Sequence, residues 1–407
     1  MPLTIEPASS VQRRPPLVSV PPEILVPIVQ LLSTGRQNHR DDIFRSGTHW
    51  STTRAREDCA RSQANLLRFA LVGKAWVGPA IQELYSRPVL AVPKRVVQFI
   101  HTLEGRVMKD RVASLKEHIR EISVLMQRNA SISPITHPRL AVILRSCPNL
   151  KSACVAVDDL NSLVSYHSVL SRSKFVEFSM CSSKWTRGPN LNWSHQHLRT
   201  LTIMGSALCF IRPPPTPLRF PRLTTLAILS DQVRDEHPLF SLHLRHADFP
   251  HLVSLTITDP KCALCFDDGL LRTIQRLSIT SMRFRYWTDP EGESFVQTDL
   301  RHFPSLTQLD LQIISRIVLD LDLIPQNVVT LSGRAFPTYT QLADPTPFSI
   351  SIRDLREALV AEPGPLVTTS GPLSTFISDC ALKCVRVVVE APSRRVIFLL
   401  VDPPGRS

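Results

Sequence analysis

The chain has 407 residues, of which 43% are hydrophobic and 20% charged, a balance typical of a protein with a folded core. No run of apolar residues approaches the roughly 18 needed to span a bilayer, so we expect no membrane partner. Lysine and arginine exceed aspartate and glutamate by 12, but the charge is spread along the whole chain. A nucleic-acid footprint should be clustered, so composition argues against that class of partner.

Residues 1–19 are expected to form a disordered tail. Glu6 and the Arg13-Arg14 pair interrupt what would be the apolar block of a secretion signal. We therefore expect a cytoplasmic or nuclear protein, in which most of the nine cysteines are small buried hydrophobes.

Residues 20–90 carry the apolar spacing of short helices. The segment PPEILVPIVQLL at 21–32 has helical periodicity, which resumes at Leu66 and continues through LVGKAW at 71–76 to Tyr85. Between these parts, residues 33–63 hold many arginines and few large apolar residues, and are expected to be a flexible, solvated insertion. The pattern predicts three short helices that bury too little surface to be robust alone.

The motif Leu-x-x-Leu-x-Ile/Leu recurs through the middle of the chain. Its central positions, spaced by 22 to 32 residues, are Ile122, Ala153, Phe178, Leu201, Leu226, Leu255, Leu277, Leu309 and Leu331. Such a period is typical of leucine-rich repeats, whose units stack into a parallel sheet with a continuous core. The alternative is a generic α/β domain with leucine-bearing strands. The shared three-point spacing and the prolines that precede several copies favour the repeat.

The residues between the motif leucines point to the opposite face of each predicted strand, because side chains alternate along a strand. They are mostly small or polar, and we expect them to line an extended surface that binds a target protein. The predicted target-binding residues are Thr200, Thr202, Thr225, Ser254, Thr256, Arg276, Ser278, Gln308 and Asp310.

The C-terminal segment at 341–407 is expected to cap the repeats at 91–340, because terminal repeats need a cap. Within it, the pattern predicts a short helix at Leu355–Val360 and a hairpin formed by Leu382–Val389 and Val396–Val401.

The sequence offers no catalytic, cofactor-binding or metal-binding site that we would predict. Phosphate-binding loops, dinucleotide glycine motifs and hydrolase motifs are missing from it. Cys262 and Cys265 could form half of a zinc site, with Cys380 and Cys384 as the other half. Their spacing and separation favour the simpler interpretation of thiols beside apolar elements. We therefore expect a protein that is not an enzyme.

The ordered triplet PPEIL, LVGKAW and LYSRPVL at 20–90 resembles the F-box motif. Its pairing with divergent leucine-rich repeats is similar to F-box proteins common in mushroom-forming fungi. The resemblance implies an α/β fold, with an N-terminal three-helix F-box-like module followed by an irregular leucine-rich-repeat solenoid with a parallel sheet. It also implies contacts with a Skp-type adaptor by Pro21, Pro22, Ile24, Leu25, Ile28, Leu71, Val72, Lys74, Trp76 and Tyr85. For Trp76, core packing is the alternative role.

The function implied by this resemblance is substrate recognition in an SCF-type cullin–RING ubiquitin ligase. The F-box would hold the Skp-type adaptor, and through it a cullin, while the repeats would hold a target protein. The alternative is a repeat scaffold outside the ubiquitin system that uses its basic surface on nucleic acid.

Overall fold

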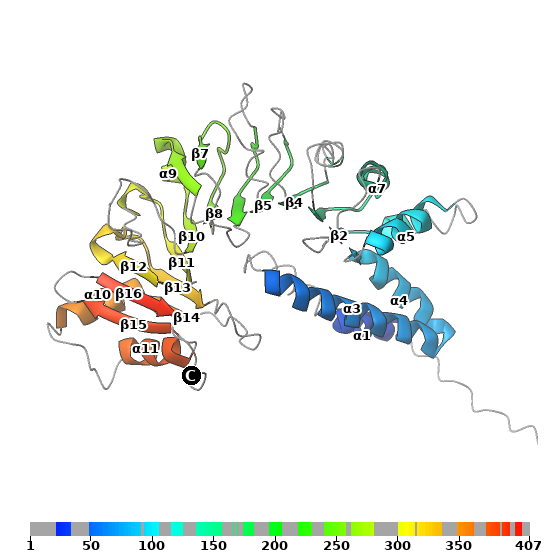
Figure 1. Ribbon diagram of the computed structural model, residues 1–407, viewed down its shortest axis with the longest axis horizontal. Coiled ribbons are helices and arrows are strands. Elements are labelled where there is room, and N and C mark those ends of the chain that lie inside the picture. Colours follow the sequence, from blue (N-terminus) through cyan, green and yellow to red (C-terminus); the bar gives the residue numbers. More distant parts are fainter. Residues whose placement is uncertain are drawn as a thin grey trace, which may run out of the picture.

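The computed structural model describes most of the segments expected to fold. It covers residues 22–33, 49–90, 93–105, 115–124, 136–156, 166, 169, 174–182, 195–205, 219–229, 240–257, 262–280, 300–313, 316–335, 348–361, 372–382, 385–390 and 395–400. The tail expected at 1–19 lies outside these residues. Figure 1 shows an arc of strands, with N-terminal helices at one end and C-terminal elements at the other.

The N-terminal helices α1 (Pro22–Ser33), α3 (His49–Val72) and α4 (Lys74–Ser86) pack against one another and form what we call the helical module. In the stretch at 33–63 that was expected to be a flexible insertion, residues 49–63 are helical and belong to α3. Residues 34–48 lie outside the described part of the chain.

Gly73 separates α3 from α4. Its φ of 178° is extended backbone that any residue adopts, and the Trp76 N–H donates to the Gly73 carbonyl oxygen at 3.0 Å. The glycine therefore does not weaken a helix interior, because the chain has already left the helix at this position.

A small core holds the helical module together. Leu25, Val29, Leu66 and Ala80 are each only 1% exposed, and they do not belong to the large cluster that fills the rest of the protein. Among the side chains of this module that the structure describes, these four form a core separate from that of the sheet.

An eleven-stranded sheet runs through the middle of the chain, which is an α/β solenoid. In spatial order its strands are β1 (Val89–Leu90), β2 (Glu121–Val124), β3 (Ser152–Ala156), β4 (Glu177–Ser182), β5 (Thr200–Gly205), β6 (Thr225–Leu229), β8 (Ser254–Ile257), β10 (Arg276–Thr280), β11 (Gln308–Ile313), β13 (Thr330–Ala335) and β14 (Phe348–Ser351). Every pairing is parallel except the last, where β14 runs antiparallel to β13.

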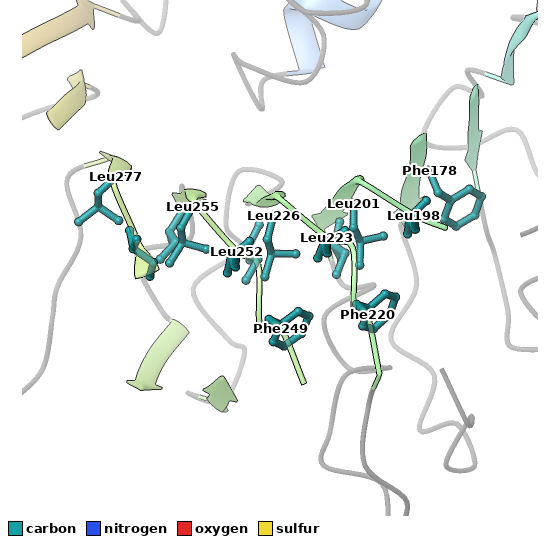
Figure 2. Packing of buried hydrophobic residues seen from close by; sticks show 14 of the residues in the cluster. Phe178, Leu198, Leu201, Phe220, Leu223, Leu226, Phe249, Leu252, Leu255 and Leu277 are labelled. Atoms are coloured by element: carbon teal, nitrogen blue, oxygen red, sulfur yellow. The ribbon is translucent and has the colours of Figure 1, made fainter. Parts of the chain in front are cut away.

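The nine predicted central positions stand opposite one another across this sheet. The register pairs Ile122 with Ala153 and continues step by step through Leu226 and Leu255 to Leu331. All nine are 2% exposed or less. Figure 2 shows Leu201, Leu226, Leu255 and Leu277 aligned across neighbouring strands. The predicted stacked parallel sheet is confirmed, because a shared spacing places equivalent residues at equivalent heights.

A repeated hydrogen-bond pattern joins the units just before each strand. The N–H groups of Lys151 and Ser152 both donate to the carbonyl oxygen of Arg120, at 2.8 and 3.3 Å. The same arrangement recurs at each step, up to Gln275, whose carbonyl oxygen accepts from Thr307 and Gln308 at 2.8 and 3.1 Å. These bonds satisfy backbone groups that the turns would otherwise leave unpaired inside the stack.

The predicted proline signals lie in tight turns before the strands. The carbonyl oxygen of the residue before proline accepts the N–H of the first motif leucine, as between Phe220 and Leu223 at 3.1 Å and between Phe249 and Leu252 at 3.2 Å. Both phenylalanines are buried, and their rings stack with centroids 5.5 Å apart. Each turn therefore adds an aromatic ring to the stacked core, as Figure 2 shows.

Helices cover the core on the outer side of the arc. They are α5 (Pro93–Glu104), α7 (Thr136–Arg145) and the short α9 (Asp268–Thr273), and Figure 1 places them outside the strands. In α5 the buried residues Val96, Phe99, Ile100 and Leu103 recur at helical spacing and face the sheet. The opposite face of the sheet, on the inside of the arc, is thus the face that carries the polar strand residues.

Several elements were not predicted from the sequence. The strand β1 makes residues 89–90 the first strand of the sheet, so the end of the helical module joins the solenoid directly. The strands β7 (Phe240–Leu244) and β9 (Cys262–Phe266) form a separate parallel pair. Short 3₁₀ helices at Leu300–His302 and Leu321–Leu323 precede or follow strands.

The C-terminal segment contains the predicted helix and hairpin. The helix α10 (Ile352–Ala361) is followed by α11 (Pro372–Leu382), and β15 (Val385–Glu390) pairs antiparallel with β16 (Arg395–Leu400). The other edge of β16 pairs with β12 (Arg316–Asp320), which ties this segment to the last repeats. None of the helices in the described ranges combines the length and the apolarity needed to cross a bilayer.

Candidate interaction surfaces

Two rows of side chains cross the inner face of the sheet. We call the first polar row the residues Glu121, Ser152, Glu177, Thr200, Thr225, Ser254, Arg276, Gln308 and Thr330. The second polar row, two residues further along each strand, is Ser123, Cys154, Ser179, Thr202, Ala227, Thr256, Ser278, Asp310 and Ser332. All nine predicted target-binding residues lie in these rows.

The two rows differ in chemistry. The first polar row includes long ionisable side chains, and its members bond along the row: the Ser152 hydroxyl donates to Glu177 Oε2 at 3.0 Å, and Arg276 Nε donates to Gln308 Oε1. The second polar row consists of short side chains and is almost uncharged, with Asp310 as its acidic member. Two of the predicted target-binding residues in this row, Thr202 and Ser278, are buried at 6% and 7% exposed. The longer side chains of the first polar row, such as Arg276 and Gln308, are better placed to form hydrogen bonds with another protein.

The sequence reasoning missed the part of each row that lies nearest the helical module. Glu121, Ser152, Glu177 and Ser179 continue the rows through β2, β3 and β4. Their repeats are the weaker copies of the motif, in which alanine, phenylalanine and isoleucine replace leucine at the central position. The spacing of the motif could have identified these residues, because each of them is adjacent in sequence to a central position.

The helical module exposes large apolar side chains on all of its helices. Exposed fractions are 51% for Ile24, 50% for Leu67, 86% for Leu71, 69% for Val72 and 42% for Val77. We call these residues the exposed apolar set. Leu67 and Leu71 are four residues apart and share a face of α3. Large exposed apolar side chains that are neighbours, as Leu67 and Leu71 are, are typical of surfaces that bind another protein.

The predicted adaptor contacts divide into two groups. Ile24, Leu71, Val72 and Lys74 are exposed and available to a partner, whereas Ile28 is half-buried. Leu25 is buried in the module core. Pro21 lies outside the described residues, and Pro22 is the first residue of α1. Leu67 and Val77 belong to the exposed apolar set but were not predicted, since helical periodicity alone does not say which apolar face is covered.

Two aromatic residues of the predicted contact set pack within the protein. Trp76 is half-buried, and its ring centroid lies 5.4 Å from that of Phe69 on α3, which agrees with the packing alternative. Tyr85 stacks on Phe99 of α5 with centroids 6.3 Å apart. Burial raises the pKa of the Tyr85 phenol, against a smaller lowering by its hydrogen bond with Thr102. Tyr85 therefore joins the helical module to the solenoid.

The cysteines considered as zinc ligands lie on different elements. Cys262 and Cys265 are on β9, Cys380 is buried in α11, and Cys384 falls outside the described residues. Across the described ranges, no group of three or more histidine, cysteine, aspartate or glutamate side chains is placed to hold a metal ion. No protein-family model matches this chain, and a search of curated proteins finds no match to it.

Proposed function

We propose that this protein is the substrate-recognition subunit of an SCF-type cullin–RING ubiquitin ligase in the cytoplasm or nucleus. The helical module at 20–90 would bind a Skp-type adaptor as an F-box does, and the leucine-rich-repeat-like solenoid would bind a target protein along its polar rows. Such a subunit acts by proximity, because it raises the concentration of the target near the ligase and makes or breaks no bond itself.

The observation that carries this proposal is the exposed apolar set on the helical module. These five large apolar side chains are 42% to 86% exposed, so they leave apolar surface of the module in water. Binding of an adaptor over these residues would remove that surface from water. The direct connection from α4 through β1 into the sheet would hold an adaptor and a target in one arrangement.

The test is binding of the purified Skp-type adaptor to the full-length protein, measured by biolayer interferometry. We expect Leu71→Asp to weaken binding roughly thirtyfold or more, since a charge buried in an apolar contact costs about 2 kcal/mol or more. Leu382→Asp is a matched control, because Leu382 is 84% exposed at the end of a different helix, against 86% for Leu71. Both variants should unfold at the temperature of the wild type.

Two results would overturn the proposal. Wild-type protein that fails to bind the adaptor would leave a repeat scaffold outside the ubiquitin system as the better hypothesis. Equal binding by Leu71→Asp and Leu382→Asp would show that the exposed apolar set is not the adaptor surface.

A further inference from the structure

A pocket of about 460 Å³ lies among the turns that precede β5, β6 and β8. It is lined by Gln196, His197, Arg219, Phe220, Pro221, Arg222, Ala247 and Pro250. These residues belong neither to the polar rows nor to the helical module. Its volume falls within the range of about 300–1,000 Å³ that is usual for small-molecule sites.

Backbone hydrogen bonds and stacked rings support the wall of this pocket. Three turns are joined by backbone hydrogen bonds, from His195 N–H to the Arg219 carbonyl oxygen at 3.0 Å and from Phe220 N–H to the Asp248 carbonyl oxygen at 2.9 Å. The buried Phe220 ring stacks on Phe249 and lies 5.7 Å from the His195 ring. The stacked aromatic core therefore supports the backbone of the turns that carry the lining residues.

The chemistry of the lining is that of an anion site. Arg219 and Arg222 are exposed, and neither makes an ion pair or a side-chain hydrogen bond with any residue that the structure describes. His197 and Gln196 add two further side chains that can donate hydrogen bonds. Guanidinium groups match phosphate oxygens in charge and in their two-pronged geometry.

The surrounding charge supports the same ligand. In the segments 195–199, 219–224 and 245–253 the exposed ionisable residues are all basic, and include Arg199 and Arg245 on either side of the pocket. The acidic residue of these segments is Asp248, which is 8% exposed. Burial raises the pKa of its carboxyl, and the nearby Arg245 opposes that change. The exposed side chains of these three segments therefore favour an anion.

We propose that this pocket binds a phosphate monoester. The phosphate would lie between Arg219 and Arg222 with His197 beside it, and a small apolar body would contact Pro221, Ala247 and Pro250. A bare phosphate ion would fill only part of the volume, so the ligand carries an organic group. The source is either a free small phosphate or a phosphorylated side chain of another protein. The inference is independent of adaptor binding, because it uses no residue of the helical module.

Isothermal titration calorimetry on the full-length protein tests the proposal with two probes, phenyl phosphate and a short phosphoserine peptide. We expect at least one to bind, and Arg219→Gln and Arg222→Gln each to weaken that binding by about tenfold or more, as expected for loss of a charged hydrogen bond. Arg386→Gln, which changes an exposed arginine on β15, should bind like the wild type. The probe with the higher affinity identifies the source of the phosphate.

Arg222→Lys refines the test, because it keeps the charge but loses the two-pronged donor and should fall between wild type and Arg222→Gln. Failure of both probes to bind would overturn the proposal, as would unchanged binding in both glutamine variants. Binding of a DNA duplex in place of both probes, with a steep loss of affinity as salt rises, would assign the arginines to a nucleic-acid surface instead. The unfolding temperature of each variant checks that the fold is retained.

Discussion

The leucine stack predicts a large difference in stability between two adjacent residues of β6. Leu226 is 1% exposed and lies between Leu201 and Leu255 in the register of the sheet. Thr225 precedes it on the same strand, is half-buried, and belongs to the first polar row. Leu226→Ala and Thr225→Ala therefore test the two faces of one strand.

The expected cost follows from the structure. Leu226→Ala removes three carbon groups from a site closed to water, worth about 2.4 kcal/mol at about 0.8 kcal/mol for each group. Neighbouring strands fix Leu201 and Leu255 on either side, so the vacated space cannot collapse fully, and a cavity contribution raises the total to about 3–4 kcal/mol. Thr225→Ala leaves no internal cavity and should cost less than about 1 kcal/mol.

Urea denaturation followed by circular dichroism and tryptophan fluorescence measures both values. Equal slopes against urea would show that each variant unfolds the same amount of structure as the wild type. Because stacked repeats can unfold in parts, the two signals should be compared for coincidence. The reasoning is refuted if Thr225→Ala costs as much as Leu226→Ala, because the leucine face would then not be the core of the sheet.

Three further substitutions test local packing and charge. Gly269→Ala should destabilise the protein by about 1–3 kcal/mol, since the added Cβ would lie 2.8 Å from His246 Cβ, although alanine is the better helix former. Gly73→Ala, whose Cβ would lie 3.9 Å from its nearest neighbour, should change the unfolding free energy by less than about 0.5 kcal/mol. If thermal unfolding shows that Gly73→Ala is the more destabilising of the two variants, the packing at α9 is contradicted. Burial raises the pKa of the Asp248 carboxyl in the folded protein. As pH rises from the pKa of the unfolded state to the higher pKa of the folded state, ionisation of this group therefore lowers the stability of the fold, and above the folded-state pKa the loss is complete. Asp248→Asn should therefore gain stability relative to wild type as pH rises from the acid range to neutrality, and a constant difference across that range in urea titrations would argue against a buried carboxyl.

The sequence predicted the solenoid because its repeat is a local pattern with a uniform consequence. Wherever Leu-x-x-Leu-x-Ile occurs, the chain makes a turn and a short strand, and units of equal construction stack in one register. The motif spacing also identified Ala153 and Phe178 as central positions, and the structure pairs them in register. The register follows from the spacing, so other apolar residues can replace leucine at this position.

Other features depended on contacts between distant segments. Residues 49–63 look like a solvated loop in composition but continue a helix that packs into the module through its C-terminal half. The strands β7 and β9 pair across an intervening repeat, and β12 pairs with the distant β16. No periodicity within one segment specifies a partner that lies many residues away.

The candidate sites were also predicted only in part from local sequence patterns. Alternation along each strand predicted the members of the polar rows on β5, β6, β8, β10 and β11 that were named as target-binding residues, since the side-chain period of a strand is two. The exposed apolar set and the arginine pocket were decided only by tertiary structure. Exposure of Leu71 and burial of Leu25 depend on which helix faces meet. Arg219 and Arg222 line one pocket with His197 only because consecutive repeats stack at the same height.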